Sequence, residues 1–224
     1  MTTRGRVGAL IVCAVAVLLV AWYAGTRFPA AAPAPAAGTV RLGPEPGEDV
    51  AGYLARVPAD LPPNGTPALA LVQLAAQLPV TDAAALTAGG APVTAVLRAP
   101  LPRVQTALRF EPLETALPPE QALVNALQRA RDGAAADAAR LAGRPGDVAA
   151  AETGLLADPA CPCVLALVVR ADRAGLTALA ARPEVRAVQA APPDATAREL
   201  ALAPLLPEQA GRADPPPDDG VIPR

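Results

Sequence analysis

The 224-residue chain contains no histidine, and neither serine nor lysine occurs anywhere in it, so all 19 of its basic residues are arginine. Without serine and histidine there is no Ser-His-Asp triad, and no imidazole is present to activate a cysteine as a nucleophile. Without lysine the chain can form neither a Schiff base nor a phosphate-binding loop with a lysine. Zinc sites that use histidine are excluded, and a four-thiolate site needs more than the three cysteines present.

Aromatic residues are also scarce, at 2% of the chain. A hydrolase with two catalytic carboxylates remains chemically open, but the clefts of such enzymes usually carry aromatic platforms as well. We therefore expect a protein that is not an enzyme and that needs no cofactor. The formal net charge of -2 lacks the basic excess with which a protein neutralises phosphates. We expect no nucleic-acid partner.

One long apolar run is present, from residue 7 to residue 24, and it contains no charged side chain. A helix needs about 20 such residues to cross a bilayer. Arg4 and Arg6 precede the run, which places residues 1–6 in the cytoplasm, and Trp22 and Tyr23 fall where an interfacial aromatic belt would lie. We expect a single-pass anchor at the cell membrane, with most of the chain outside the cytoplasm.

A cleaved signal peptide is the competing interpretation of the same run. Trp22 opposes cleavage after Ala24, because the third residue before the cut should be small, and the small-residue motif at 34–36 lies far from the apolar core. Cys13 is preceded by Val12 instead of the small residue of a lipoprotein motif, so we interpret it as an apolar residue of the span.

The remaining chain divides by composition. Residues 25–66 are rich in proline and alanine and predict an extended stalk with a short helix near 50–57. Residues 67–193 alternate strand and helix patterns and predict an extracytoplasmic α+β domain. Residues 194–224 are rich in proline and aspartate and predict a largely disordered C-terminal tail.

Two strand-helix-strand units are predicted inside the domain, at 68–98 and 163–190, with a strand and a long helix inserted between them. The first helix would begin at Thr81 and end at Gly89, and the second would be capped by Asp172. The inserted strand is expected at 102–113 and the long helix at 118–143. Two such units predict a ferredoxin-like sandwich, with helices on one face of an antiparallel sheet.

The second unit resembles the end of subtilase propeptides and related inhibitor modules, in which a leucine-rich helix is followed by Pro-x-Val-x-x-Val. The matching positions here are Leu176, Leu179, Pro183, Val185 and Val188. The resemblance covers about thirty residues and implies a ferredoxin-like fold and inhibition of a protease. No protease domain follows in this chain.

Cys161 and Cys163 flank Pro162 at the start of an apolar strand pattern. In a regular strand their α-carbons would lie about 6.6 Å apart, and a disulfide would need a kink there. Four interpretations stay open: buried inert thiols, a strained disulfide within the chain, disulfides between chains, and a soft-metal site of the kind that suits Cu(I).

Three arginines, Arg98, Arg103 and Arg109, lie in or beside predicted strands. They would either bind an anionic group together or form a solvated face. Taken with the anchor, the sequence predicts a non-catalytic binding or scaffolding protein of the cell envelope, whose partner is another envelope protein. The alternatives are thiol-dependent redox or soft-metal handling through Cys161 and Cys163, and propeptide-like protease inhibition.

Overall fold

The computed structural model describes residues 38–223, which belong to one compact unit. Strands and helices alternate along this unit, so the predicted α+β class is confirmed. The apolar run at 7–24 lies outside the described residues. Among the residues that are described, no helix combines the length and the apolar character that a membrane span requires.

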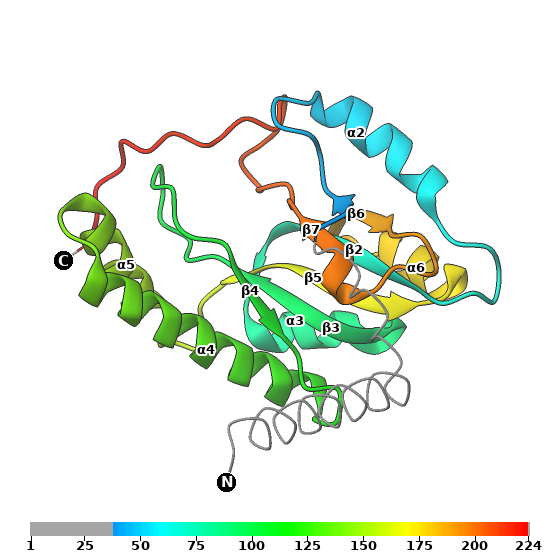
Figure 1. Cartoon of the computed structure of the whole chain (residues 1–224), viewed down its shortest axis with the longest axis horizontal. Helices are drawn as coiled ribbons and strands as arrows, with labels where there is room; N and C mark the ends of the chain where they lie inside the picture. Colours follow the sequence, from blue (N-terminus) through cyan, green and yellow to red (C-terminus); the bar gives the residue numbers. More distant parts are fainter. Residues whose placement is uncertain (1–37, 224) are drawn as a thin grey trace, which may run out of the picture. The chain divides into compact units, whose positions relative to one another are not determined.

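A five-stranded antiparallel sheet forms the centre of the unit, in the order β4-β3-β5-β2-β6 (Figure 1). Its strands are β2 (Ala68–Leu78), β3 (Ala91–Leu97), β4 (Arg109–Pro112), β5 (Val164–Ala171) and β6 (Val185–Ala190). The middle strand β5 is almost wholly apolar, and its residues from 164 to 169 are at most 1% exposed. Such a strand requires cover on both faces of the sheet.

Helices cover the first face. They are α3 (Val80–Leu86), α4 (Pro119–Arg140) and α6 (Arg173–Ala180), with α5 (Arg144–Leu155) packed on α4. Alternate residues of β2, namely Ala70, Val72 and Leu74, face these helices in the main core, because successive side chains of a strand point to opposite faces. Asp172 caps α6 by accepting the Gly175 amide, as predicted.

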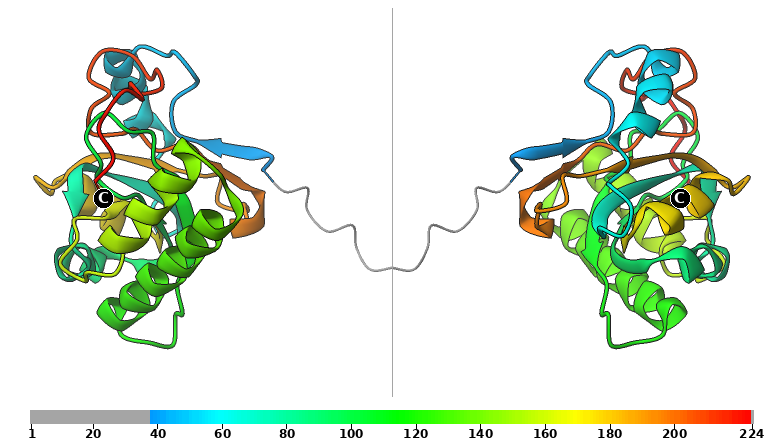
Figure 2. Two further views of the ribbon diagram at one scale, coloured as in Figure 1. Left: turned by 90° about the vertical axis from the view of Figure 1, so that its left-hand side faces the viewer. Right: turned by 90° about the vertical axis from the view of Figure 1, so that its right-hand side faces the viewer.

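The second face of the sheet is covered by both ends of the described chain. Strand β1 (Val40–Leu42) pairs in parallel with β7 (Leu200–Leu202), and this pair packs on Leu69 and Leu71 of β2. Helix α2 (Val50–Arg56) lies on the side of the sheet opposite to α4 (Figure 2). Three short 3-10 helices complete the unit, η1 (Val57–Asp60), η2 (Thr87–Gly89) and η3 (Ala197–Glu199).

The expected domain boundaries of 67–193 are therefore too narrow. Part of the predicted stalk and most of the predicted disordered tail are integral to the domain. The physical reason is the second face of β2, whose Leu69 and Leu71 are apolar and are stable only when another layer removes them from water.

A buried polar network ties this second layer to the sheet. The fully buried Tyr53 of α2 donates its hydroxyl to Gln189 Oε1 (2.9 Å) and accepts a hydrogen bond from Gln73 Nε2 (2.5 Å). The same two glutamines accept the amides of Gly43 and Leu205, both at 2.7 Å. Burial raises the pKa of Tyr53 to about 12. Every buried polar group named here has a partner, as stable interiors require.

Two local predictions were wrong, and one helix was missed. Pro79, and not Thr81, is the N-cap of α3. The strand expected at 102–113 is reduced to β4, because residues 99–108 leave the sheet as a loop in which Arg103 has φ of 55°. Helix α5 was not predicted, because its only large apolar residues are Val148 and Leu155, which give no clear apolar periodicity.

Candidate functional site

The C-terminal segment, residues 214–223, runs over the surface of the domain along the 99–108 loop and α5 (Figure 1). It is held partly through the backbone. The Gly220 amide donates to the Arg103 carbonyl oxygen (2.7 Å), and the Gln105 amide donates to Asp218 Oδ1 (3.0 Å). The Gln105 side chain also donates to the Pro216 carbonyl oxygen (2.6 Å). These bonds fix an extended segment in one register.

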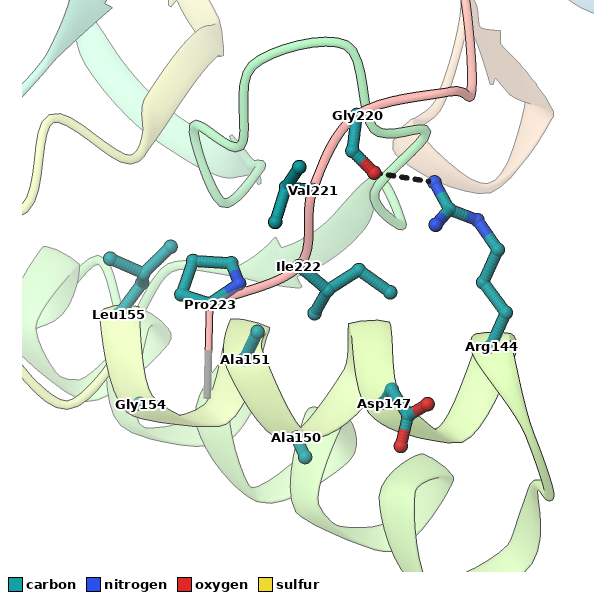
Figure 3. Close-up of a pocket in the computed structure, with 10 residues that line it drawn as sticks. All are labelled: Arg144, Asp147, Ala150, Ala151, Gly154, Leu155, Gly220, Val221, Ile222 and Pro223. Atoms are coloured by element: carbon teal, nitrogen blue, oxygen red, sulfur yellow. Dashed lines mark hydrogen bonds between the residues drawn. The ribbon is translucent and has the colours of Figure 1, made fainter.

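Two arginines face the acidic pair of this segment. Arg103 binds Asp219 in a bidentate ion pair, in which Nε donates to Oδ1 (2.7 Å) and Nη2 donates to Oδ2 (2.5 Å). Arg144 Nη2 donates to Asp218 Oδ1 (3.1 Å) and to the Gly220 carbonyl oxygen (3.2 Å; Figure 3). The hydrogen bonds from Arg144 and Arg103 hold the pKa values of Asp218 and Asp219, respectively, below their usual range. Both pairs are solvent-exposed, so they fix orientation more than they add stability.

An apolar contact completes the attachment. Ile222 packs against a small cluster of Leu101, Val104 and Val148, which is separate from the main core. We call the residues beneath the segment the tail-binding surface; they are Leu101, Arg103, Val104, Gln105, Arg144 and Val148. The combination of backbone hydrogen bonds, charge pairs and one apolar anchor is the way in which extended peptides are commonly recognised.

The segment does not fill the space above α5. A cavity of about 690 Å³ remains between them; its helical side has Arg144 and Asp147 at one end and the small residues Ala150, Ala151 and Gly154 farther along (Figure 3). Val221, on the rim of this cavity, is 88% exposed. Side chains this small leave room for a larger apolar group than the segment provides.

The 99–108 loop has its own internal support. Thr106 Oγ1 donates to the Ala99 carbonyl oxygen (2.8 Å). The Ala107 amide donates to Glu152 Oε1 (2.7 Å), and the other oxygen of Glu152 accepts from Arg109 (2.8 Å). Glu152 is only 2% exposed, so it is a buried carboxylate whose two oxygens are both occupied. The tail-binding surface is therefore anchored to α5 independently of the C-terminal segment.

A second cavity, of about 420 Å³, lies beside this loop and is lined by Arg109, Asp137 and Glu152 among others. Arg109 Nη2 pairs with both carboxylates, while its buried Nε has no partner among the described residues. Within residues 38–223, no group of three or more His, Cys, Asp or Glu side chains is placed to hold a metal ion.

The structure places the two cysteines in a disulfide, with their α-carbons 5.2 Å apart. A tight turn brings them together, in which the Cys163 amide donates to the Cys161 carbonyl oxygen (2.8 Å) around Pro162. Cys161 is 6% exposed and Cys163 is fully buried. The kink that the sequence argument required is thus present just before β5.

The arginines singled out from the sequence do not converge on one anion site. Arg98 is buried and pairs with Glu208 (2.7 Å), while Arg103 and Arg109 pair with the carboxylates described above. The membrane-interface residues predicted from the sequence are outside the described part of the chain; they are Arg4, Arg6, Trp22 and Tyr23.

Of the residues that form the tail-binding surface, sequence reasoning singled out Arg103 alone, and it missed the segment that occupies the surface. The acidic pair Asp218-Asp219, followed by a glycine and two aliphatic residues, interrupts an otherwise proline-rich stretch and was the available signal. Comparisons with family models, with curated proteins and with solved structures find no match to this chain.

Proposed function

We propose that this chain is a single-pass membrane protein whose extracytoplasmic domain binds another envelope protein without catalysing a reaction. The uncharged run at 7–24, with Arg4 and Arg6 before it, supports the anchor and a cytoplasmic N-terminus. The Cys161–Cys163 disulfide supports an oxidising compartment for the domain. The tail-binding surface carries the binding role, because it already holds an extended segment through backbone, ionic and apolar contacts.

A ferredoxin-like sandwich is the fold that we propose for the domain core. With β4 set aside as an added edge strand, the sheet order is β3-β5-β2-β6, and the first strands of the two βαβ units, β2 and β5, lie side by side in its middle. Helices α3 and α6 connect the strands of these units and contribute to the same core cluster on one face. This arrangement supports the expectation drawn from the two units.

The test uses the full chain in its native membrane. A photoreactive amino acid replaces Ala150, which is exposed on the floor of the larger cavity, and a control chain carries it at the exposed Leu117. We expect a discrete adduct with one envelope protein from position 150 only. The adduct should disappear when Arg103 and Arg144 are both changed to glutamate. The same adducts from positions 150 and 117, or persistence in the double variant, would contradict a binding role for this surface.

Redox or soft-metal handling is the second candidate; the disulfide between Cys161 and Cys163 favours the redox role, whereas soft-metal binding requires that the bond be reduced first. It predicts that mild reduction of the folded chain frees both thiols for alkylation, and that replacing both cysteines by alanine abolishes Cu(I) uptake while the fold persists. The burial of both cysteines opposes ready exchange. If alkylation requires unfolding, the disulfide has a structural role only.

Protease inhibition is the third candidate and rests on the propeptide resemblance. Four of its five positions, Leu176, Leu179, Val185 and Val188, are buried in the main core, so packing alone accounts for their apolar character. Titration of the domain against subtilisin-type proteases tests this candidate, and it predicts tight stoichiometric inhibition.

A further inference from the structure

The contacts that hold the C-terminal segment are mostly exposed. The side chains of Arg103 and Asp219 are 62% and 64% exposed, and those of Arg144 and Asp218 are 41% and 43% exposed. Ion pairs in such positions are screened by salt and weak. Ile222 is only partly buried. A segment held in this way can be displaced, whereas the loop beneath it keeps its own hydrogen bonds to Ala99 and Glu152.

The chemistry of the preferred occupant can be deduced from the surface. Arg103 and Arg144 each bind one carboxylate of the Asp218-Asp219 pair, so a ligand of this surface needs two adjacent carboxylates. Glycine must follow, because a β-carbon at position 220 would overlap the Pro102 carbonyl oxygen and lie 2.8 Å from that of Arg103. Ile222 only partly fills the cavity above Ala150, Ala151 and Gly154, whereas Val221 is 88% exposed, so a larger apolar side chain fits two positions after the glycine.

We infer that the C-terminal segment is an intramolecular competitor that occupies the tail-binding surface until a partner displaces it. The partner supplies an extended segment with two adjacent carboxylates, then a glycine, and a large apolar side chain two positions after the glycine. This inference rests on the proposed function, because it specifies the ligand of the same surface. It adds a regulatory element. The apparent affinity for the partner is the intrinsic affinity multiplied by the fraction of chains whose surface is free, so docking of the C-terminal segment lowers it.

The structure offers a variant that releases the segment without touching the surface. Gly220→Ala introduces the β-carbon that overlaps the Pro102 carbonyl oxygen, while Gly211→Ala is a matched control, because nothing lies within 4 Å of a β-carbon there. Release is measured by hydrogen exchange of the Gly220 and Gln105 amides, which are both bonded in the docked state. If the Gly220 and Gln105 amides stay protected in Gly220→Ala, the segment has not been released. A chain that ends at Ala213 and lacks the segment is then used as the released form.

Binding is measured on the full chain in lipid nanodiscs, with a fluorescein-labelled peptide of the sequence DPPPDDGVIP as the probe. We expect the released chain to bind it at least about ten-fold more tightly than the wild type or the Gly211→Ala control. Adding Arg103→Glu and Arg144→Glu to the released chain should abolish binding. A probe with phenylalanine in place of isoleucine should bind about four-fold more tightly, which corresponds to burying roughly 35 Å² more apolar surface.

Equal affinity of the wild-type and released chains would overturn the competitor role. Equal affinity for the isoleucine and phenylalanine probes would overturn the assignment of the partner's large apolar residue. Dimers of the wild type that form by exchange of C-terminal segments would make a second copy the occupant and overturn a separate partner. If peptide binding behaves as expected but no cross-link forms at position 150 in membranes, the proposed function fails while the competitor role stands.

Discussion

Alkaline pH should destabilise the domain through Tyr53 alone. Residues 36–224 form the compact unit and contain one tyrosine, no lysine and no histidine, and their two cysteines are joined in the disulfide. The arginines remain charged throughout the accessible range. Tyr53 is fully buried and hydrogen-bonded to Gln73 and Gln189, and burial raises its pKa to about 12.

The size of the effect follows from the pKa difference between the folded and unfolded chains. The unfolded phenol ionises at about pH 10, so the folded and unfolded states are both neutral below that pH and stability is unaffected. Above it the unfolded state loses a proton that the folded state keeps, and stability falls as pH rises towards 12. The free energy of unfolding should drop by about 1.4 kcal/mol at about pH 11, and by about 2.7 kcal/mol over the whole interval.

The assay follows phenolate absorbance in residues 36–224. This fragment contains no tryptophan, so the phenolate signal comes from Tyr53 only. We expect the folded fragment to titrate late and cooperatively with loss of circular dichroism, whereas the denaturant-unfolded fragment titrates near pH 10. Urea denaturation at several pH values gives the free energies directly.

A folded-state titration near pH 10 without unfolding would refute the burial of the Tyr53 hydroxyl. Tyr53→Phe is the control. It should cost about 1–3 kcal/mol at neutral pH, because two glutamines lose a partner, and it should remove the alkaline loss of stability. A Tyr53→Phe fragment that still loses stability between pH 9 and 11 would show that another group is responsible.

The remaining predictions concern stability and are measured by urea denaturation. Glu152→Ala should cost about 3–5 kcal/mol, because it leaves a loop amide and Arg109, whose side chain is 12% exposed, without this carboxylate. Asp137→Ala, at the more exposed partner of the same arginine, should cost clearly less, and equal losses would contradict this. Gly43→Ala should cost about 3 kcal/mol or more, because φ at this position is +120° and the added β-carbon would overlap the carbonyl oxygen of Ala203, the residue after β7. Gly65→Ala, where only φ is unfavourable, should cost about 1 kcal/mol, and similar values for the two glycines would count against the close approach. Removing the disulfide should cost only about 1.6 kcal/mol, because the loop that it closes is very short; complete unfolding on reduction would contradict that estimate.

The central elements were predictable because their signals are local. Strand β5 is a continuous apolar run, and α6 has a capping aspartate at Asp172 and an apolar face formed by Leu176 and Leu179. Helix α4 begins at a proline pair and repeats its apolar residues at helical spacing. In each case, neighbouring residues on one element contain the whole signal.

The candidate site was not predictable in the same way, because its contacts join distant positions. Arg103 and Asp219 are 116 positions apart, and nothing near either residue specifies the other. The proline- and aspartate-rich composition of the last residues is typical of disorder. A prediction of disorder from composition holds only when the fold offers no complementary surface. Here the arginines of the 99–108 loop and α5 provide that surface, and only the fold brings them together.

The parallel pairing of β1 with β7 has a consequence for the timing of folding. Gly43 donates its amide to Gln189, which lies 146 positions later in the chain, and β7 follows later still. Synthesis proceeds from the N-terminus, so β1 emerges with no partner and the outer face of β2 stays uncovered until nearly the whole chain has been made. Contacts of such long sequence separation slow folding and leave apolar surface open to aggregation meanwhile. A chaperone that shields this face during synthesis would therefore protect the chain at its most vulnerable stage.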